Sequence, residues 1–371
     1  MNKRLLSGLV VPSLLLSTAY FTPAWAVSDG APQSRASLLV GSARSCGMGE
    51  MTTIVDDGAV AIWWNPGMIA LDRRIQANVT TSKLAEGLAD DIRLWTFNLH
   101  GGLFDPEFGI AGGFGYTYLD LGESDIITEE GDQIGSFSSA DHLFNLVVGG
   151  SALDMIGFGL ALEYSYSKLS PQIRELGIDD GTGTALSISL GVVAKPEFRF
   201  GSSGVSLSHN GRDEPAFFIS PVAGISILHY GSEIVYNDQN QPEDLPRQFH
   251  TALGLSIGFD QGSGVWGADL RRLLRANLFL GAEYDKSLVG SKDDIGHYGA
   301  ELRLAGILSL RGGYVDDHEG RIEDHTWGIG LGNEELLPVG VRIDYARVPQ
   351  AEDLPRVHRW EFMVSLRPEL L

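Results

Sequence analysis

Acidic and arginine side chains recur at every second position along several segments of the chain, where they could form ion pairs. Five carboxylates and four guanidinium groups share this spacing: Glu163, Glu283, Glu301, Arg303, Arg311, Arg342, Asp344, Arg359 and Glu361. Alternate residues of a β-strand point to the same face of a sheet. A near balance of opposite charges on one face therefore predicts a network of ion pairs lining an enclosed interior, because buried charges need partners.

Catalytic or metal-binding chemistry would need other spacings, and the chain lacks them. The histidines that such sites would use are scattered: His100, His142, His250, His297, His325 and His358. No pair has the His-Glu-x-x-His spacing of a zinc site, and no Gly-x-Ser-x-Gly elbow presents a nucleophilic serine. We therefore expect no enzymatic activity, no metal site and no cofactor.

Apolar residues alternate with small or polar residues in one segment after another. Clear examples run from Phe158 to Tyr166, from Phe249 to Phe259, from Val339 to Tyr345 and from Trp360 to Leu366. Similar segments begin near positions 75, 91, 108, 142, 184, 216, 276, 297, 307 and 325, with Asp-Pro and Asp-Asp turn signals between them. A membrane-spanning strand needs ~9–11 residues, and bacterial barrels have even strand numbers, so we predict an all-β, antiparallel barrel of about 14 strands.

Two architectures share this period of two, and three features favour the one that spans a membrane. In a soluble sandwich or barrel the apolar faces fill the core, whereas in a transmembrane barrel they face lipid. The charged residues lie on the opposite face from the apolar ones. Tyrosines and Trp360 lie near the ends of the apolar faces, as in interfacial aromatic girdles. The third feature is an export signal at the N-terminus.

Composition excludes several other classes of protein. The chain has 371 residues, 47 of them glycine, with 43% hydrophobic residues and a formal charge of −21. The hydrophobic fraction excludes intrinsic disorder, and the absence of a long uninterrupted apolar run after the N-terminus excludes a bundle of transmembrane helices. The single cysteine excludes a disulfide scaffold. The acidity argues against nucleic acid as a partner, since nucleic-acid binding needs a basic surface.

The N-terminal part of the chain divides into two segments before the barrel. Residues 1–26 read as a signal peptide, with Lys3 and Arg4 before an apolar run and a small-x-small cleavage site ending at Ala26. Residues 27–74 do not alternate, so we predict a plug or hatch that folds into the lumen of the barrel formed by residues 75–371. Its central residues would form the plug and line a ligand path: Trp63, Trp64, Asn65, Pro66, Gly67 and Met68. Asn-Pro-Gly predicts a turn here, with a positive φ available at the glycine. Small residues on the inner wall, such as Gly113, Gly115 and Gly191, leave room for a second backbone.

Several short motifs, in this order, resemble those of the PorV/PorQ family of outer-membrane proteins, within the wider FadL-like superfamily. In the N-terminal part these are Gly47-Met48-Gly49, Val55-Asp56-Asp57-Gly58-Ala59 and Trp64-Asn65-Pro66-Gly67. In the C-terminal half they are Pro246-Arg247-Gln248-Phe249-His250, Leu310-Arg311-Gly312-Gly313-Tyr314, Ile343-Asp344-Tyr345-Ala346 and His358-Arg359-Trp360. The family usually reads Asn-Pro-Ala-Gly where this chain has Asn65-Pro66-Gly67-Met68.

The resemblance implies a non-enzymatic barrel in the cell outer membrane that assists secretion or surface attachment of exported proteins. Its partners would be outer-membrane lipid and lipopolysaccharide, together with exported cargo or type IX secretion components. The FadL branch implies an alternative, a passive transporter of hydrophobic small molecules. For that alternative Trp63, Trp64 and Met68 would line an apolar path, and Pro221 would mark a gap in the wall. Plain packing of the tryptophans and a bulge or strand boundary at Pro221 are the competing interpretations.

Overall fold

The computed structural model describes residues 35–366 apart from residue 88 and segments 105–107, 128–130, 132, 170–180, 202–203, 208–214, 237–241, 261–274, 291–293, 334–337 and 352–353. The predicted signal peptide, residues 1–26, lies outside the described residues, as do residues 27–34 of the predicted plug. Within the described part of the chain, no helix combines the length and the apolar character needed to cross a membrane.

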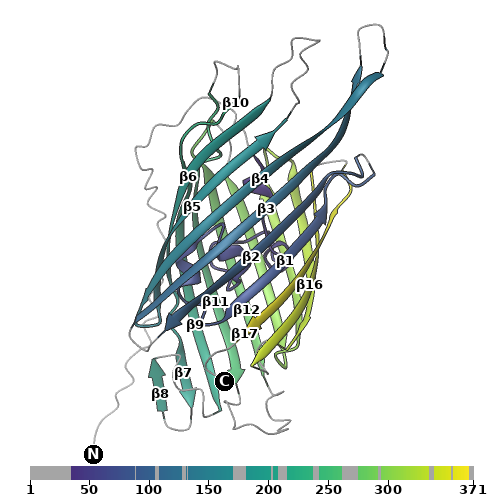
Figure 1. Cartoon of the computed structure of the whole chain (residues 1–371). Helices are drawn as coiled ribbons and strands as arrows, with labels where there is room; N and C mark the ends of the chain where they lie inside the picture. Colours follow the sequence, from purple (N-terminus) through teal and green to yellow (C-terminus); the bar gives the residue numbers. More distant parts are fainter. Residues whose placement is uncertain are drawn as a thin grey trace, which may run out of the picture.

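Fourteen long antiparallel strands form a closed barrel, which confirms the predicted architecture and strand number. The first strand pairs with both the second and the last, so the sheet has no free edge there (Figure 1). The wall strands are β1 (Ile75–Lys83), β2 (Arg93–Phe104), β3 (Phe108–Ile127), β4 (Gln133–Ala152), β5 (Ile156–Lys168), β6 (Thr182–Ala194), β9 (Ala216–Gly231), β11 (Gln248–Asp260), β12 (Ala276–Ser287), β13 (Ile295–Leu304), β14 (Leu308–Asp317), β15 (Ile322–Gly332), β16 (Val339–Val348) and β17 (Val357–Leu366).

Three short strands extend this wall around β6 and β9. β7 (Phe198–Gly201) and β8 (Gly204–Leu207) form a hairpin, and β7 pairs with the first residues of β9. β10 (Val235–Tyr236) pairs with the first residues of β6 at the other end of the barrel. The wall is therefore uneven at β6 and β9, whose mutual pairing covers only part of each strand.

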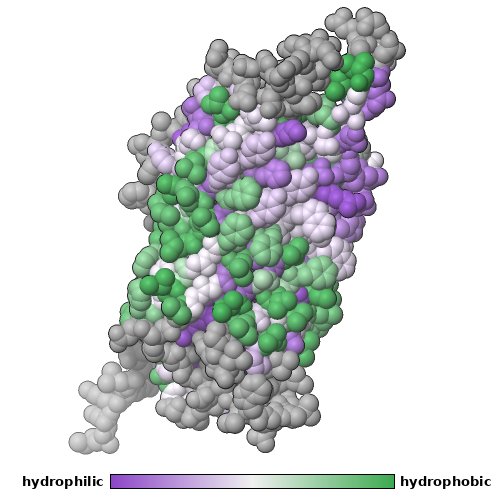
Figure 2. Space-filling model, viewed as in Figure 1, coloured by the Kyte–Doolittle hydropathy of each residue, from purple (hydrophilic) through white to green (hydrophobic). Residues whose placement is uncertain are grey.

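The two faces of the wall have opposite character, as the alternation predicts. Phe158, Ile343 and Phe362 point outward and are 49%, 44% and 51% exposed, although they are large and apolar. Their strand neighbours Glu163, Asp344 and Glu361 point inward and are buried. Figure 2 shows hydrophobic residues (green) over the left and lower part of the barrel wall, and paler or purple residues toward the upper right. An apolar outer face and a polar inner face are the pattern of a transmembrane barrel, whose outer residues contact acyl chains.

Residues 35–74, hereafter the lumenal segment, lie inside the barrel (Figure 1, purple) and are mostly buried. The segment contains a 3-10 helix, η1 (Arg35–Leu39), and three single-turn helices, α1 (Ala43–Cys46), α2 (Gly58–Ala61) and α3 (Pro66–Ile69). Asn65 caps α3 by accepting a hydrogen bond from the Gly67 N–H at 3.0 Å, and Pro66 occupies the first helical turn. The predicted turn with a positive φ at Gly67 is therefore wrong, because proline and an asparagine cap begin a helix equally well.

Glycines on the inner wall let the lumenal segment lie directly against the strands. A Cβ on Gly115 would lie 2.7 Å from Trp63 Cζ2, and one on Gly191 would lie 2.0 Å from Asn65 Oδ1. Either contact is shorter than van der Waals packing permits. These small inward residues therefore lie next to the lumenal segment, where the prediction expects room for a second backbone.

Candidate functional site

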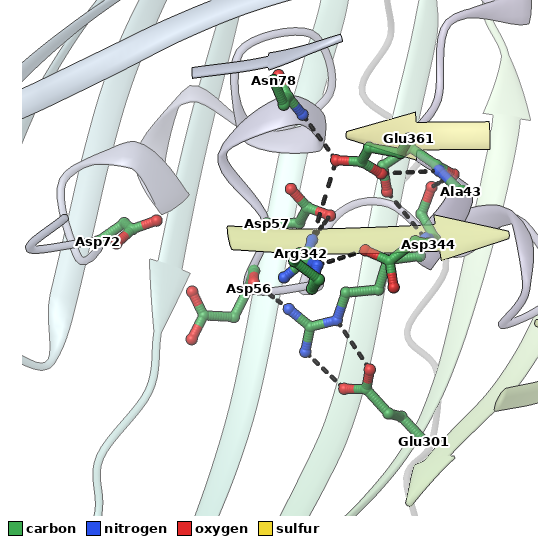
Figure 3. Close-up of polar contacts among 12 residues, drawn as sticks. Ala43, Asp56, Asp57, Asp72, Asn78, Glu301, Arg342, Asp344 and Glu361 are labelled. Carbon is green, nitrogen blue, oxygen red and sulfur yellow. Dashed lines mark hydrogen bonds and ion pairs between the residues drawn. The ribbon is translucent and has the colours of Figure 1, made fainter. Parts of the chain in front are cut away.

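Ion pairs inside the barrel centre on Arg311 of β14 and Arg342 of β16. Arg311 contacts Glu301 through Nε at 2.7 Å and Asp344 through Nη1 at 2.5 Å. Arg342 pairs with Asp344 and lies 3.9 Å from Glu361 (Figure 3). Glu301 faces Arg311 across β13 and β14, and Asp344 faces Glu361 across β16 and β17, while Arg311 reaches Asp344 across the glycines of β15. These five side chains are the part of the predicted network that the structure joins.

The lumenal segment supplies two members of this network that the sequence reasoning missed. Arg44 of α1 makes a two-pronged contact with Glu301, with Nη2–Oε2 at 2.6 Å and Nε–Oε1 at 3.1 Å. Asp57 accepts a hydrogen bond from Arg342 Nη2 at 3.2 Å. Paired guanidinium and carboxylate groups with this geometry give specificity of position as well as energy. The network therefore fixes the lumenal segment to the wall at two places.

Two predicted members of the network also bind the backbone of the lumenal segment. Glu361 accepts from the Ala43 N–H at 2.9 Å and from Asn78 Nδ2 at 2.7 Å (Figure 3). Arg359 donates to the carbonyl oxygens of Leu39 and Gly41, at 3.1 and 3.2 Å. Unpaired peptide groups in a buried segment are costly, so these contacts satisfy groups that the short helices leave open.

Glu283 of β12 binds the turn that connects α1 and α2. Its carboxylate accepts from the backbone N–H and the hydroxyl of both Thr52 and Thr53, at 2.7–2.8 Å. His250 Nδ1 lies 3.0 Å from the same carboxylate and 2.7 Å from Asp285. His250, Glu283 and Asp285 are close enough to surround a cation. However, the threonines already occupy both oxygens of Glu283, so a cation would displace existing hydrogen bonds.

Beside this group, His297 links β13 to the lumenal segment. Its Nδ1 lies 2.7 Å from the Gly49 carbonyl oxygen, and its Nε2 lies 3.0 Å from an Asp285 oxygen. A carbonyl oxygen can only accept, so Nδ1 carries hydrogen and donates to Gly49. His297 therefore ties the segment's backbone to Asp285 of the wall.

The remaining two charges of the predicted network lie apart from its centre. Arg303 lies 3.6 Å from Glu301, at the edge of the group. Glu163 of β5 lies on the far side of the barrel, where His229 Nδ1 approaches it to 3.3 Å. The period of two predicted that both face the lumen, but it carried no information about which strands would lie next to them.

The residues predicted to form the plug, Trp63 to Met68, are all buried. Trp63 donates through Nε1 to Asn98 Oδ1 at 2.7 Å, and Trp64 donates to the Val40 carbonyl oxygen at 2.8 Å. Asn65 Nδ2 donates to the Thr53 carbonyl oxygen at 2.9 Å. In this structure the six residues pack the segment onto itself and the wall, and their contact with a ligand stays a prediction.

Pro221 lies on the outward face of β9, which continues through it and pairs it with Leu255 of β11. On the other side of β9, the ladder with β6 ends at Ala223 and the ladder with β7 begins at Ile219. Pro221 thus sits at a strand boundary of its neighbours, where a missing N–H costs little. A wall gap at this place stays a prediction.

The single cysteine, Cys46, ends α1 and is buried beneath Arg359, whose Nη1 lies 3.2 Å from the sulfur. Burial raises the pKa of the Cys46 thiol to about 11, although the nearby guanidinium opposes the shift. The thiol is therefore protonated and unreactive at neutral pH.

No protein-family model matches the sequence, and no curated protein matches it. Among solved structures, the toluene transporter TodX of Pseudomonas putida is 12% identical, covers 92% of this chain and 100% of its own, and has a TM-score of 0.41. The toluene transporter TbuX of Ralstonia pickettii is 12% identical over 88% of this chain and 97% of its own, with a TM-score of 0.42. A FadL homologue of Pseudomonas aeruginosa is 10% identical over 88% and 98%, with a TM-score of 0.37. These similarities do not confirm the PorV/PorQ resemblance.

Proposed function

We propose that the chain is an outer-membrane channel through which hydrophobic small molecules diffuse, with the lumenal segment as its plug. The observation that carries this proposal is the two-sided attachment of the segment. Toward β12–β17 it is held by ion pairs and hydrogen bonds, including those of Glu283, Glu301 and Glu361. Toward β3 and β4 it packs mainly through apolar side chains on wall glycines, with Asn145 Nδ2 donating to the Ile62 carbonyl oxygen at 2.9 Å.

The apolar side is the one suited to passage. Ile62 and Trp63 lie against Gly113 and Gly115, and Ile69 lies against Gly149. Removing one partner of a buried ion pair costs roughly 3–5 kcal/mol of stability. Dispersion contacts between apolar groups are individually small, and an apolar guest molecule can replace them with contacts of its own. A hydrophobic molecule can therefore replace side-chain contacts on this side while the other side keeps the segment in place.

The apolar outer face supports a location in the outer membrane, where lipid and lipopolysaccharide would surround the barrel. The other function that the sequence predicts, assistance to secretion or surface attachment of exported proteins, stays a prediction. Its partners would be exported cargo proteins or secretion components.

Uptake across an intact outer membrane tests the proposal, because a lipopolysaccharide leaflet resists apolar solutes that cross simple phospholipid bilayers. Radiolabelled toluene would be supplied to Gram-negative cells with and without the protein, and the initial rate of uptake measured. We expect faster uptake in cells that contain the protein. Equal rates, together with co-purification of exported proteins, would favour the secretion function instead.

A further inference from the structure

A β-bulge in β9 turns one additional side chain into the lumen. Ile188 and Leu190 of β6 are two residues apart, yet their partners Tyr230 and Ile227 on β9 are three apart. The additional residue is accommodated at His229, whose φ is 56°. Leu228 and His229 are therefore both buried on the inner side, opposite Ser189. A non-glycine residue in this conformation is strained, and bulges of this kind re-aim side chains near functional sites.

The re-aimed imidazole reaches across a whole strand. His229 on β9 and Glu163 on β5 are separated by β6, so their backbones are about 10 Å apart, two strand spacings. Their side chains nevertheless approach to 3.3 Å, Nδ1 to Oε1. The inward residues of β6 beneath them are serines, Ser187 and Ser189, which leave the space above β6 to the longer side chains.

Several polar atoms at this place have no hydrogen-bond partner among the described residues. They are Glu163 Oε2, Ser187 Oγ and Nε2 of His229, whose Nδ1 faces Glu163 Oε1. Each of these residues is 2% exposed, so bulk water does not satisfy them. Leaving a buried polar group unpaired costs about 1–3 kcal/mol, and more for a charged one. Glu283, by contrast, is satisfied by four donors from the lumenal segment.

Apolar clusters border this polar group. Leu228, which precedes His229, belongs to the cluster that contains Trp64 of the lumenal segment. Ala185, two positions from Ser187 on the same face of β6, belongs to a second cluster with Ile234, Tyr236 and Leu245. A molecule at this site would therefore meet a small polar patch between apolar surfaces.

We propose that Glu163, His229 and Ser187 form a binding site for the hydroxyl group of an otherwise apolar molecule, an alcohol or a phenol. A hydroxyl can donate to Glu163 Oε2 and accept from Ser187 or from the imidazole, so one group satisfies several unpaired atoms. A carboxylate would be repelled by Glu163, and a plain hydrocarbon would leave the atoms unpaired. This inference rests on the proposed channel function and specifies its substrate class.

Matched probes separate this site from general apolar binding. The full-length protein in detergent would be titrated with 1-naphthol and with 1-methoxynaphthalene, followed by probe fluorescence. The two probes share an aromatic system, but the ether cannot donate a hydrogen bond. We expect the wild type to bind the naphthol at least ~10-fold more tightly, as a hydrogen bond to a charged acceptor predicts. Equal affinities would overturn the inference and mean that water alone fills the site.

Variants test which side chains cause the preference for the hydroxyl-bearing probe. His229→Gly keeps the positive φ of the bulge and removes the imidazole, and Glu163→Gln keeps the shape and removes the charge. Both are expected to reduce the ratio of the two affinities toward one. Ser151→Ala removes another buried hydroxyl, on β4, and is expected to keep the wild-type ratio. An unchanged ratio in both His229→Gly and Glu163→Gln would also overturn the inference. Binding of both probes without preference, combined with toluene uptake in cells, would leave the channel function standing.

Discussion

Arg44 and Glu301 form a two-pronged ion pair between residues 257 positions apart, the first in the lumenal segment and the second in β13. Both side chains are nearly inaccessible to solvent. The pair therefore joins the interior of the barrel to its wall in a place where either charge alone would be unfavourable.

Replacing Arg44 with methionine is expected to lower the free energy of unfolding by roughly 3–5 kcal/mol, because Glu301 would keep a buried charge with one fewer partner. Guanidinium-induced unfolding in detergent measures the change. Arg44→Met combined with Glu301→Gln should recover part of the loss, since the carboxylate that lost one of its partners no longer carries a charge. The control is Arg356→Ala, which breaks a partly exposed pair with Asp324 and should cost at most ~1 kcal/mol. A loss no larger than that of the control would contradict the prediction.

Replacing Glu283 with glutamine is expected to release the turn at Thr52 and Thr53. A glutamine presents an NH₂ group to backbone N–H donors, so about 1–3 kcal/mol is lost for each donor left unsatisfied. Hydrogen–deuterium exchange with mass spectrometry should show faster exchange in peptides covering residues 48–56. Glu323→Gln, at an exposed contact with His318, should leave exchange there unchanged. Unaltered protection in the Glu283 variant would show that the carboxylate does not hold the turn.

The thiol of Cys46 is expected to resist maleimide at pH 7.5 in the folded protein and to react at once after denaturation. Burial keeps the reagent away from the sulfur. The pKa of about 11 keeps the thiol protonated, whereas the thiolate is the form that reacts. The sign of the pH effect follows from the same shift. Between the ordinary thiol pKa of 9.0 and about 11 only the unfolded chain loses the proton, so raising the pH through this interval lowers stability. Cys46→Ala should remove this part of the pH dependence, and rapid labelling of the folded protein would argue against the packing around α1.

Two glycines of β3 offer a matched pair. Gly115→Ala adds a methyl group 2.7 Å from Trp63 and is expected to cost about 1–3 kcal/mol by overpacking. Gly112→Ala, on the same strand, meets nothing closer than 3.7 Å and should be nearly neutral. Thermal unfolding followed by tryptophan fluorescence compares them. Equal effects would mean that Trp63 does not rest on this wall in the folded protein.

Local alternation predicts the wall well because it depends only on neighbouring residues. The inward positions of Asp344 and Glu361, and the outward positions of Ile343 and Phe362, follow from their parity within a strand. Parity does not say which strands face each other across the lumen, so the partners of Glu163 and Arg359 could not be predicted. Glu163 meets His229 of the β9 bulge, and Arg359 meets carbonyl groups of the lumenal segment.

Alternation could not predict the contacts of the lumenal segment or the position of the bulge, for different physical reasons. Arg44 and Asp57 have no strand period, and only the folded segment brings them to Glu301 and Arg342. His229 shifts the register by one residue, and a bulge depends on pairing with β6 rather than on a local signal. The tripeptide Asn65-Pro66-Gly67 is compatible with both a turn and the start of a helix. In the structure it starts α3, and Asn65 packs against Gly191.

The pairing of β1 with β17 also sets an order of assembly. Because β1 directly follows the lumenal segment, the ring around that segment cannot close until β17 pairs with β1. A chain truncated before β17 would therefore leave β1 without one of its two partners and the lumenal segment uncovered on that side.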